Sequence, residues 1–248
     1  MPGTTDLVVT STERRTPTLV RVRFRSDDLG AFAESVFTDR YVKLVIPTAD
    51  GDVVRTYTAV EPDVEAGTLA IDFVVHGDDG FAGPWAARAE PGDLLTVRGP
   101  GGAYAPDPAA DWHLFAGDES AIPAIGAAVA ALPAGATAYV VLEVAGPDHH
   151  VELPSAADVE VVWLHRGADA PLVEAVRALP WREGRVHAFV HGEAEAVMHG
   201  IRPYLLGDRS LPREDVSISG YWRLGRTEEG FRDWKAELAA QESAANGS

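Results

Sequence analysis

The feature that most constrains this fold is a change in the rhythm of the sequence near residue 108. Before this point, short runs alternate apolar and polar residues, as in Val20 to Arg25, where arginine takes every second position. A period of two is typical of a strand with one buried face. After this point, apolar runs alternate with longer segments of helical pattern. The chain therefore divides into a strand-rich first half and a mixed second half.

The first half is expected to form a small barrel. Strands are predicted over residues 20–25, 41–46, 53–60, 69–76 and 94–98. Short strands spaced this evenly favour a closed antiparallel barrel, and an open sandwich is the alternative.

The second half is expected to contain a parallel sheet, because strands that alternate with helices pack with both sheet faces covered. Strands are predicted over 112–116, 138–144, 159–164, 186–190 and 216–219, and helices over 121–132, 171–179, 194–206 and 227–241. The linker is Ala105 to Pro108, where two prolines disfavour helix and strand interiors. We therefore expect an antiparallel β-barrel domain over residues 1–108, followed by an α/β parallel-sheet domain over 109–248.

Composition excludes several functions. The chain carries 38 acidic and 21 basic residues, a net charge of −17, which disfavours nucleic acids and anionic membranes as partners. It has no cysteine, so disulfides, thiolate nucleophiles and iron–sulfur clusters are excluded and redox chemistry requires a bound cofactor. No long apolar run or signal-peptide pattern occurs, and we expect a cytoplasmic monomer without membrane insertion.

No metal site is expected. His149 and His150 lie in an acidic loop flanked by proline, and no acidic or histidine partner stands at metal-ligand spacing in the sequence. We interpret this pair as solvated.

The tetrapeptide Arg55-Thr56-Tyr57-Thr58 is the first candidate binding motif. Strand alternation places Arg55 and Tyr57 on one face, and Thr56 and Thr58 on the other. A cation beside an aromatic ring suits a phosphate attached to a flat heterocycle, as in a flavin nucleotide. A solvated arginine on an amphipathic strand is the alternative.

A glycine-rich turn over residues 77–85 is the second candidate. Small residues let backbone N–H groups approach a ligand, and a helix beginning near Trp85 would present free N–H groups to a phosphate. Ala82, Gly83 and Trp85 can donate, whereas Pro84 cannot. An ordinary glycine loop is the alternative.

Together, residues 55–58, 72–77 and 85–93 resemble the FAD domain of the siderophore-interacting proteins, which are ferric-siderophore reductases. Residues 117–125 and 220–225 are similar to the second domain of that family. The resemblance covers nearly the whole chain in the family's order.

The resemblance implies an FAD site. Arg55 would pair with the pyrophosphate, Tyr57 would pack on the isoalloxazine ring, and Thr58 would form a hydrogen bond with that ring near its reactive nitrogen. The implied site also includes Thr56, backbone groups of Val74 and Val75, His76 near the phosphates, and the turn at Ala82, Gly83 and Trp85. The family usually has an arginine at the position of Val60 and a small hydroxyl residue at Gly83, so both departures bear on the affinity for FAD.

The resemblance also implies a site for NADPH or NADH. Residues 117–120 follow the first strand of the second half, and ligands bind at such carboxyl ends. Arg166, at another strand end, would bind the 2′-phosphate of NADPH. The remaining implied contacts are Asp118, Glu119, Ser120, Ala121, Gly192, Glu193, Tyr221 and Trp222.

The implied reaction is hydride transfer from NAD(P)H to FAD, followed by single-electron transfer to the iron of a ferric siderophore and release of Fe(II). The flavin carries the chemistry, so no side chain is expected to be catalytic. Lys43 and Arg223 are the substrate-binding candidates, because an anionic ferric chelate needs positive charge. The alternatives are a general flavin reductase or diaphorase, and a non-catalytic carrier of a ferric chelate or flavin.

Overall fold

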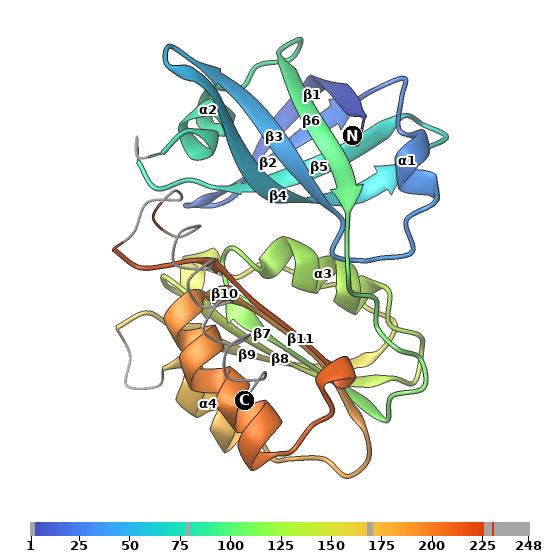
Figure 1. Cartoon of the computed structure of the whole chain (residues 1–248), viewed down its shortest axis with the longest axis vertical. Helices are drawn as coiled ribbons and strands as arrows, with labels where there is room; N and C mark the ends of the chain where they lie inside the picture. The colour runs from blue at the N-terminus through green and yellow to red at the C-terminus, as the bar shows by residue number, and fades with distance from the viewer. Residues whose placement is uncertain (1–2, 78–79, 168–170, 226–229, 231–248) are drawn as a thin grey trace, which may run out of the picture.

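The computed structural model describes residues 3–77, 80–167, 171–225 and 230. A barrel lies above a parallel sheet along the long axis of the molecule (Figure 1). The terminal helix expected over residues 227–241 lies outside the described residues, apart from Gly230.

Six antiparallel strands close the barrel, in the order β1-β2-β5-β4-β3-β6, so the predicted barrel is confirmed and the open sandwich is wrong. The strands are β1 (Thr4–Thr16), β2 (Leu19–Arg25), β3 (Tyr41–Thr48), β4 (Gly51–Asp63), β5 (Thr68–Val74) and β6 (Leu94–Gly101). Strand β1 was missed, because its second half is almost entirely polar and exposed and therefore shows no alternation.

Alternate residues of these strands fill the barrel. Val22, Phe24, Leu44 and Phe73 are among its fully buried side chains. Two short helices, α1 (Gly30–Ala33) and α2 (Ala82–Arg88), pack against the strands, and the ring of Trp85 in α2 lies 6.4 Å from that of Phe24. The barrel interior is thus filled by side chains, and a ligand must bind outside it.

The outer face of the barrel that meets the second domain contains a buried ion pair. Arg21 on β2 donates to both carboxylate oxygens of Asp72 on β5, at 2.6 and 2.8 Å, and also pairs with Glu61. Burial acts to lower the pKa of Arg21, but the bonds and charges of Asp72 and Glu61 outweigh it and raise the pKa. Arg21 is therefore a structural cation that pairs with Asp72, one of the residues that line the cleft.

The second half forms the predicted parallel sheet, and its five strands follow the order β11-β10-β7-β8-β9. Its strands are β7 (Trp112–Asp118), β8 (Thr137–Val144), β9 (Asp158–His165), β10 (Val186–Glu193) and β11 (Val216–Trp222). The main helices are α3 (Ile122–Ala130), α4 (Leu172–Ala178) and two π-type segments, η2 (Glu195–Ile201) and η3 (Tyr204–Asp208). Short 3₁₀ turns are η1 (Pro147–His149) and η4 (Arg213–Asp215).

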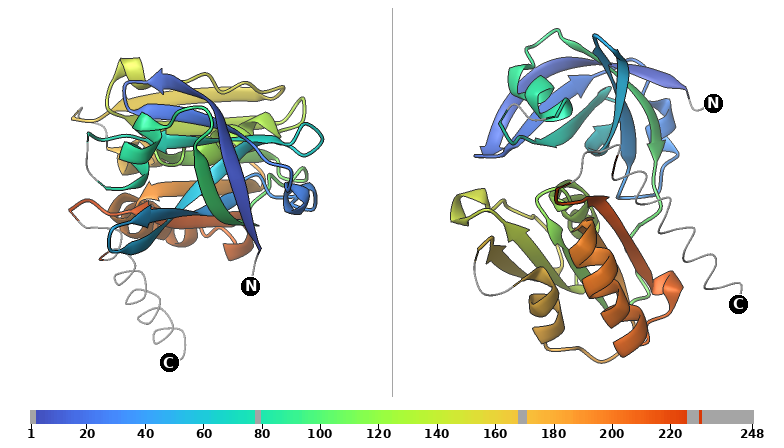
Figure 2. Two further views of the ribbon diagram at one scale, coloured as in Figure 1. Left: turned by 90° about the horizontal axis from the view of Figure 1, so that it is seen from above. Right: turned by 60° about the vertical axis from the view of Figure 1, so that its left-hand side comes forward.

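Helix α3 lies between the barrel and the sheet, and α4 and η2 lie on the opposite face (Figures 1 and 2). The chain runs outward from β7 to β8 and β9, then returns to place β10 and β11 on the other side of β7. Strands β7 and β10 therefore form the switch point at which parallel sheets bind ligands. Because α3 packs over β7 and β8, the barrel-facing side of β10 and β11 is left to line a cleft.

Gly117 is required where β7 passes β10. A Cβ at this position would overlap the carbonyl oxygen of His191 and lie 2.7 Å from the Cβ of Ala121. We expect Gly117→Ala to lower the free energy of unfolding by about 3 kcal/mol, because neither the backbone nor α3 can move freely. Urea denaturation measures this loss.

The matched control is Gly126→Ala within α3, where the nearest neighbour of a new Cβ is the Leu153 side chain at 3.5 Å. This variant is expected to be neutral or to gain up to about 1 kcal/mol from helix propensity. Equal stability of the two variants would contradict the steric explanation.

Candidate active site

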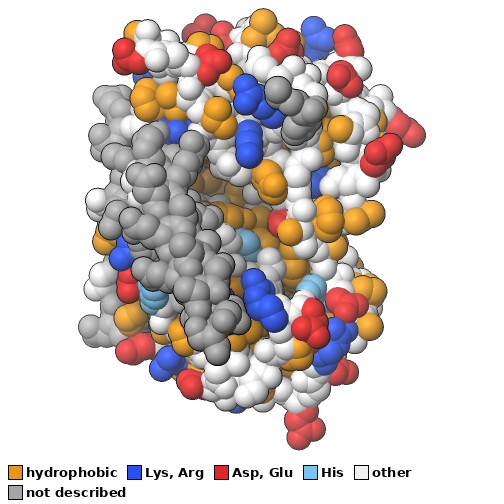
Figure 3. Space-filling model, in the orientation of Figure 1, with side chains coloured by type: hydrophobic (Ala, Val, Ile, Leu, Met, Phe, Trp, Pro, Cys, Tyr) orange, Lys and Arg blue, Asp and Glu red, His pale blue; other side chains and the backbone are white. Residues whose placement is uncertain are grey.

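A cleft of about 1150 Å³ separates the barrel from the sheet. Figure 3 shows it as a hollow at mid-height, with basic side chains above and below it. Residues from β3, β4 and β5 line the barrel side, and residues of β11 and the ends of β7 and β10 line the other side. The volume exceeds the roughly 300–1,000 Å³ of sites for drug-sized molecules, so the cleft has room for a dinucleotide.

The four residues of the β4 motif all line this cleft. Tyr57 lies opposite Val42 in the β3–β4 register, on the face that packs toward the barrel core, and its ring is 4.8 Å from that of Phe73. The guanidinium of Arg55 lies 5.5 Å from the centre of the Phe81 ring. A cation and an aromatic face are thus presented together, as the alternation predicted.

The turn before α2 differs from the prediction. The helix begins at Ala82 and not near Trp85, so the N–H of Trp85 donates to the carbonyl of Phe81 at 3.1 Å. The prediction that this N–H is free for a phosphate is wrong. Ala82 and Gly83 remain in the first turn, where the helix itself provides no acceptor for an N–H.

The glycine at position 83 has a structural reason. A Cβ there would lie 3.0 Å from the carbonyl oxygen of Val74. Gly83 therefore allows α2 to approach the end of β5 closely, whereas a larger residue would push the two apart.

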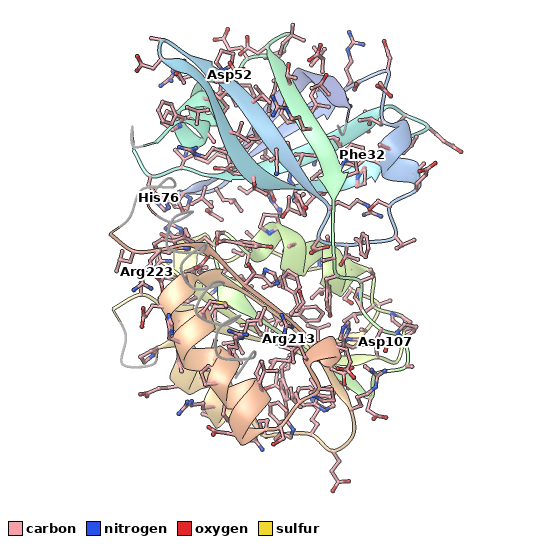
Figure 4. All side chains as sticks on the ribbon, viewed as in Figure 1. Phe32, Asp52, His76, Asp107, Arg213 and Arg223 are labelled. Atoms are coloured by element: carbon pink, nitrogen blue, oxygen red, sulfur yellow. The ribbon has the colours of Figure 1, made fainter. Side chains whose placement is uncertain are left out.

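The end of β5 is only partly available to a ligand. The N–H of Val75 donates to the carbonyl of Thr18 at 2.8 Å and its side chain is buried, so this N–H is engaged within the protein, and contact of the other backbone groups of Val74 and Val75 with a flavin stays a prediction. Val74 and His76 do line the cleft, and His76 is exposed at the lower edge of the barrel (Figure 4).

The carboxylate of Asp118 connects the ends of three parallel strands on the opposite wall. It accepts from the N–H and hydroxyl of Ser120 at 2.9 and 2.5 Å, from the N–H of Glu193 at 2.7 Å and from the indole N–H of Trp222 at 2.8 Å. Burial raises the pKa of Asp118, although the bonds from Ser120 and Trp222 oppose this. Asp118 therefore holds the ends of β7, β10 and β11 together at the wall of the cleft.

Arg166 lines the cleft but is already engaged. Its guanidinium makes a two-pronged contact with Glu119, one bond being 2.7 Å long, and lies 3.6 Å from Glu143. The predicted role of Arg166 toward a 2′-phosphate would require it to leave Glu119. Glu119 and Arg166 form a nearly neutral pair beside Asp118.

Three further predicted contacts have structural roles. Ala121 is fully buried, and its N–H donates to the carbonyl of Asp118 at 2.9 Å. The carboxylate of Glu193 accepts N–H groups of Ala196 and Leu224 at 2.9 and 3.1 Å. Gly192 has a φ of 147° and packs on Asp118, while Tyr221 and Trp222 line the cleft as expected.

The two predicted substrate residues are not brought together. Lys43 is exposed on the outer face of β3, directly opposite Arg98 of β6. Arg223 donates to Glu195 at 2.6 Å and lines a smaller hollow beside η2 (Figure 4). Lys43 therefore has a basic neighbour that sequence reasoning missed, because only the strand register creates it.

The acidic lining of the cleft is largely compensated. Of the five described acidic residues that line it, Asp72 pairs with Arg21, Glu119 pairs with Arg166, and Asp118 accepts four hydrogen bonds. Asp39 accepts the N–H groups of Ala103 and Tyr104, each at 2.9 Å. An anionic ligand therefore meets fewer uncompensated charges than the net charge of −17 suggests.

Sequence reasoning missed the aromatic floor of the cleft. The rings of Tyr104 and His187 stack with centroids 4.7 Å apart, and His191 stacks on Phe189 at 3.9 Å. His187 and His191 alternate on the barrel-facing side of β10, and His191 lies 3.0 Å from the hydroxyl of Ser217 on β11. The sequence shows that His187 and His191 lie on one face of a strand, but only the packing of the barrel decides that this face lines the cleft.

His113 lies behind this floor, opposite His187 in the β7–β10 register. It is 1% exposed, and its Nδ1 has no partner among the described residues. Burial, and then the nearby His187, lower the pKa of His113 to about 4. The folded protein therefore holds His113 neutral at pH 5, whereas the unfolded chain protonates it below about pH 6.5.

This difference predicts a loss of stability in acid. Because the pKa is lower in the folded state, stability is full above pH 6.5 and is lost as the pH falls toward 4. Between pH 7 and pH 5 we expect His113 to account for a loss of about 2 kcal/mol in the free energy of unfolding. His113→Phe should remove this part of the loss, measured by urea denaturation at both pH values.

His76→Phe is the control for removing one histidine at an exposed position. The explanation fails if the profiles of wild type and His113→Phe stay parallel between pH 7 and pH 5.

The prediction that His149 and His150 are merely solvated is wrong, because each has a partner within the protein. His149 Nδ1 shares a 2.9 Å hydrogen bond with the hydroxyl of Thr18 in the barrel, and His150 Nε2 lies 2.9 Å from Nε2 of His165. The partner of His150 comes from the next strand, which spacing along the chain could not reveal. Within the described residues, no group of three or more histidine and acidic side chains converges as in a metal site.

No helix in the described part of the chain combines the length and apolar character needed to cross a membrane. A barrel joined to a parallel sheet, with a binding cleft between them, defines the architecture of the ferredoxin-reductase-like proteins. A ferredoxin reductase of carbazole 1,9a-dioxygenase shares this fold, with a TM-score of 0.68 and 15% identity over 89% of this chain and 70% of that one.

The chain belongs to the siderophore-interacting protein family. Residues 110–225 match the siderophore-interacting protein family and residues 48–104 match the siderophore-interacting FAD-binding domain. The ferric vibriobactin reductase ViuB of Vibrio cholerae is 34% identical over 87% of this chain and 88% of its own. The structure of a siderophore utilization protein from T. fusca matches with a TM-score of 0.80 and 35% identity, covering 91% of this chain and 94% of that one.

Proposed function

We propose that this protein is an FAD-dependent ferric-siderophore reductase that takes its electrons from NAD(P)H. The observation that carries the proposal is the single cleft in which the Arg55–Thr58 strand faces the carboxyl ends of β7, β10 and β11. Membership of a family with an FAD-binding domain, and a relative named for reduction of ferric vibriobactin, support it.

The residues of the barrel side fit an FAD group. Arg55 would meet the pyrophosphate, and the N–H groups of Ala82 and Gly83 in the first turn of α2 would add donors. Tyr57 would pack against the isoalloxazine, and Thr56 and Thr58 would supply hydroxyls beside it. When bound, FAD would supply the conversion of a two-electron hydride donor into single-electron transfer to iron.

Val60 replaces the arginine that the family usually carries, and it is buried on the face of β4 that also carries Thr58. No second cation stands at this position, so Arg55 would be the main positively charged side chain of this motif toward the FAD phosphates. The proposal predicts a strong dependence of FAD affinity on Arg55.

The sheet side would bind the nicotinamide donor. Asp118 holds the ends of β7, β10 and β11 at fixed distances, and Ser120, Tyr221 and Trp222 surround the resulting recess. Ligands of parallel sheets bind at this switch point. Since Arg166 is paired with Glu119, the proposal includes both NADH and NADPH as donors.

The substrate would approach between the barrel and η4. Tyr41 lines the cleft, Lys43 and Arg98 follow it on the outer face of β3 and β6, and Arg213 lines the cleft from the sheet domain. Figure 3 shows basic side chains above and below the hollow, and Figure 4 places Arg213 below it. Positive charge on both sides would attract an anionic ferric chelate.

The decisive experiment is a reaction of the FAD-loaded protein with NADH or NADPH under anaerobic conditions. NAD(P)H oxidation that depends on a ferric siderophore and forms Fe(II), detected with a colorimetric Fe(II) chelator, is the expected result. Oxidation with quinones or free flavins but not with ferric chelates would favour a general flavin reductase. Binding of a ferric chelate without NAD(P)H oxidation would favour a carrier.

Arg55→Leu tests the FAD site. We expect its dissociation constant for FAD to rise by roughly 10- to 100-fold, because one charge-assisted contact with phosphate is lost. Fluorescence titration with FAD measures this change. Arg25→Leu, at an exposed arginine of β2 outside the cleft lining, is the control and should bind FAD like wild type.

Lys43→Gln tests the substrate surface. We expect KM for an anionic ferric siderophore to rise by roughly three- to tenfold at low salt with kcat unchanged, because the charge acts on binding alone. The difference from wild type should shrink in high salt. Arg25→Gln is the control, and an equal rise in KM for both variants would contradict a local role for Lys43.

A further inference from the structure

Two histidines that are 15 positions apart in the sequence meet on the surface of the sheet domain. His150 follows the η1 turn, and His165 is the last residue of the edge strand β9. Their Nε2 atoms are 2.9 Å apart in a hydrogen bond. One ring must donate and the other accept, so a single hydrogen lies between two nitrogen lone-pair positions.

This separation matches that of two imidazoles on one metal ion. Nitrogen ligands bound at about 2.05 Å lie about 2.9 Å apart at a right angle and about 3.3 Å apart at the tetrahedral angle. An ion bound to both nitrogens at these angles would lie beside the line that joins them, so each ring must turn by roughly 35–45° while the separation of the nitrogens changes by less than about 0.5 Å. The two rings are inclined by 28° with centroids 5.1 Å apart, so they lie end to end and their Nε2 atoms face one another.

The pair is held in place by its neighbours. The ring of His150 stacks on Trp163 at 4.5 Å with an angle of 15° between the planes. His150 is thus packed against a neighbour, and the backbone of His165 is fixed at the end of β9, which lowers the entropic cost of binding an ion.

We propose that His150 and His165 form a surface site for one divalent transition-metal ion, with water completing its coordination. Imidazole ligands suit copper, nickel and zinc, and affinity should follow the order Cu²⁺ above Ni²⁺ and Zn²⁺. Neither histidine lines the cleft. The site is therefore separate from the proposed reductase activity and does not depend on it.

Calorimetric titration of the untagged full chain with Cu²⁺, Ni²⁺ and Zn²⁺ tests this site. We expect one high-affinity ion per chain for wild type, and a loss of affinity of roughly tenfold or more in His150→Asn and in His165→Asn. His149→Asn is the matched control, because it removes the adjacent histidine and leaves the pair intact. Thermal melts without metal check that each variant folds, and either pair variant alone is sufficient for the comparison.

Fluorescence provides a second measurement that is local to the site. Cu²⁺ at His150 should quench Trp163, which stacks on it, so Trp163→Phe should retain the calorimetric affinity but lose most of the quenching. Equal metal affinity in wild type and both pair variants would overturn the proposal. An equal loss in His149→Asn would overturn it too, because the ligands would then be different residues.

Discussion

The arrangement of the cleft depends on one buried carboxylate. Asp118 ends the central strand β7 and accepts hydrogen bonds from Ser120, from the end of β10 at Glu193 and from the end of β11 at Trp222. A buried charge is tolerated only when its hydrogen bonds are made, so these three segments must stay together while Asp118 is ionised. Gly117 and Gly192 on either side permit this close packing.

The same principle explains how a strongly acidic chain presents a cleft suited to anions. Arg21 neutralises Asp72 from the barrel, Arg166 neutralises Glu119 from the position after β9, and backbone N–H groups satisfy Asp39. These acidic side chains are engaged within the walls of the cleft, and Arg55 and Arg213 also line it. Position therefore matters more than the net charge of −17.

The predictions succeeded where local pattern sufficed and were wrong where a distant partner intervened. Alternation correctly placed Arg55 and Tyr57 on one face, because the strand pleat fixes it. The helix start at α2 was wrong by three residues, and with it the role of the Trp85 N–H. His150 was called solvated because its partner, His165, lies on the next strand. The N–H of Val75, one of the backbone groups expected to contact a flavin, donates instead to the carbonyl of Thr18.

By itself the sequence determined the two-part architecture, the absence of cysteine chemistry and the binding motif on β4, because periodicity and composition are local properties. The tertiary structure alone decided which charges pair with one another within the protein. It paired Arg166 with Glu119, placed Arg98 beside Lys43 and brought His150 to His165. Such pairings follow from strand order and register, which bring together residues far apart in the chain, and no spacing rule encodes them.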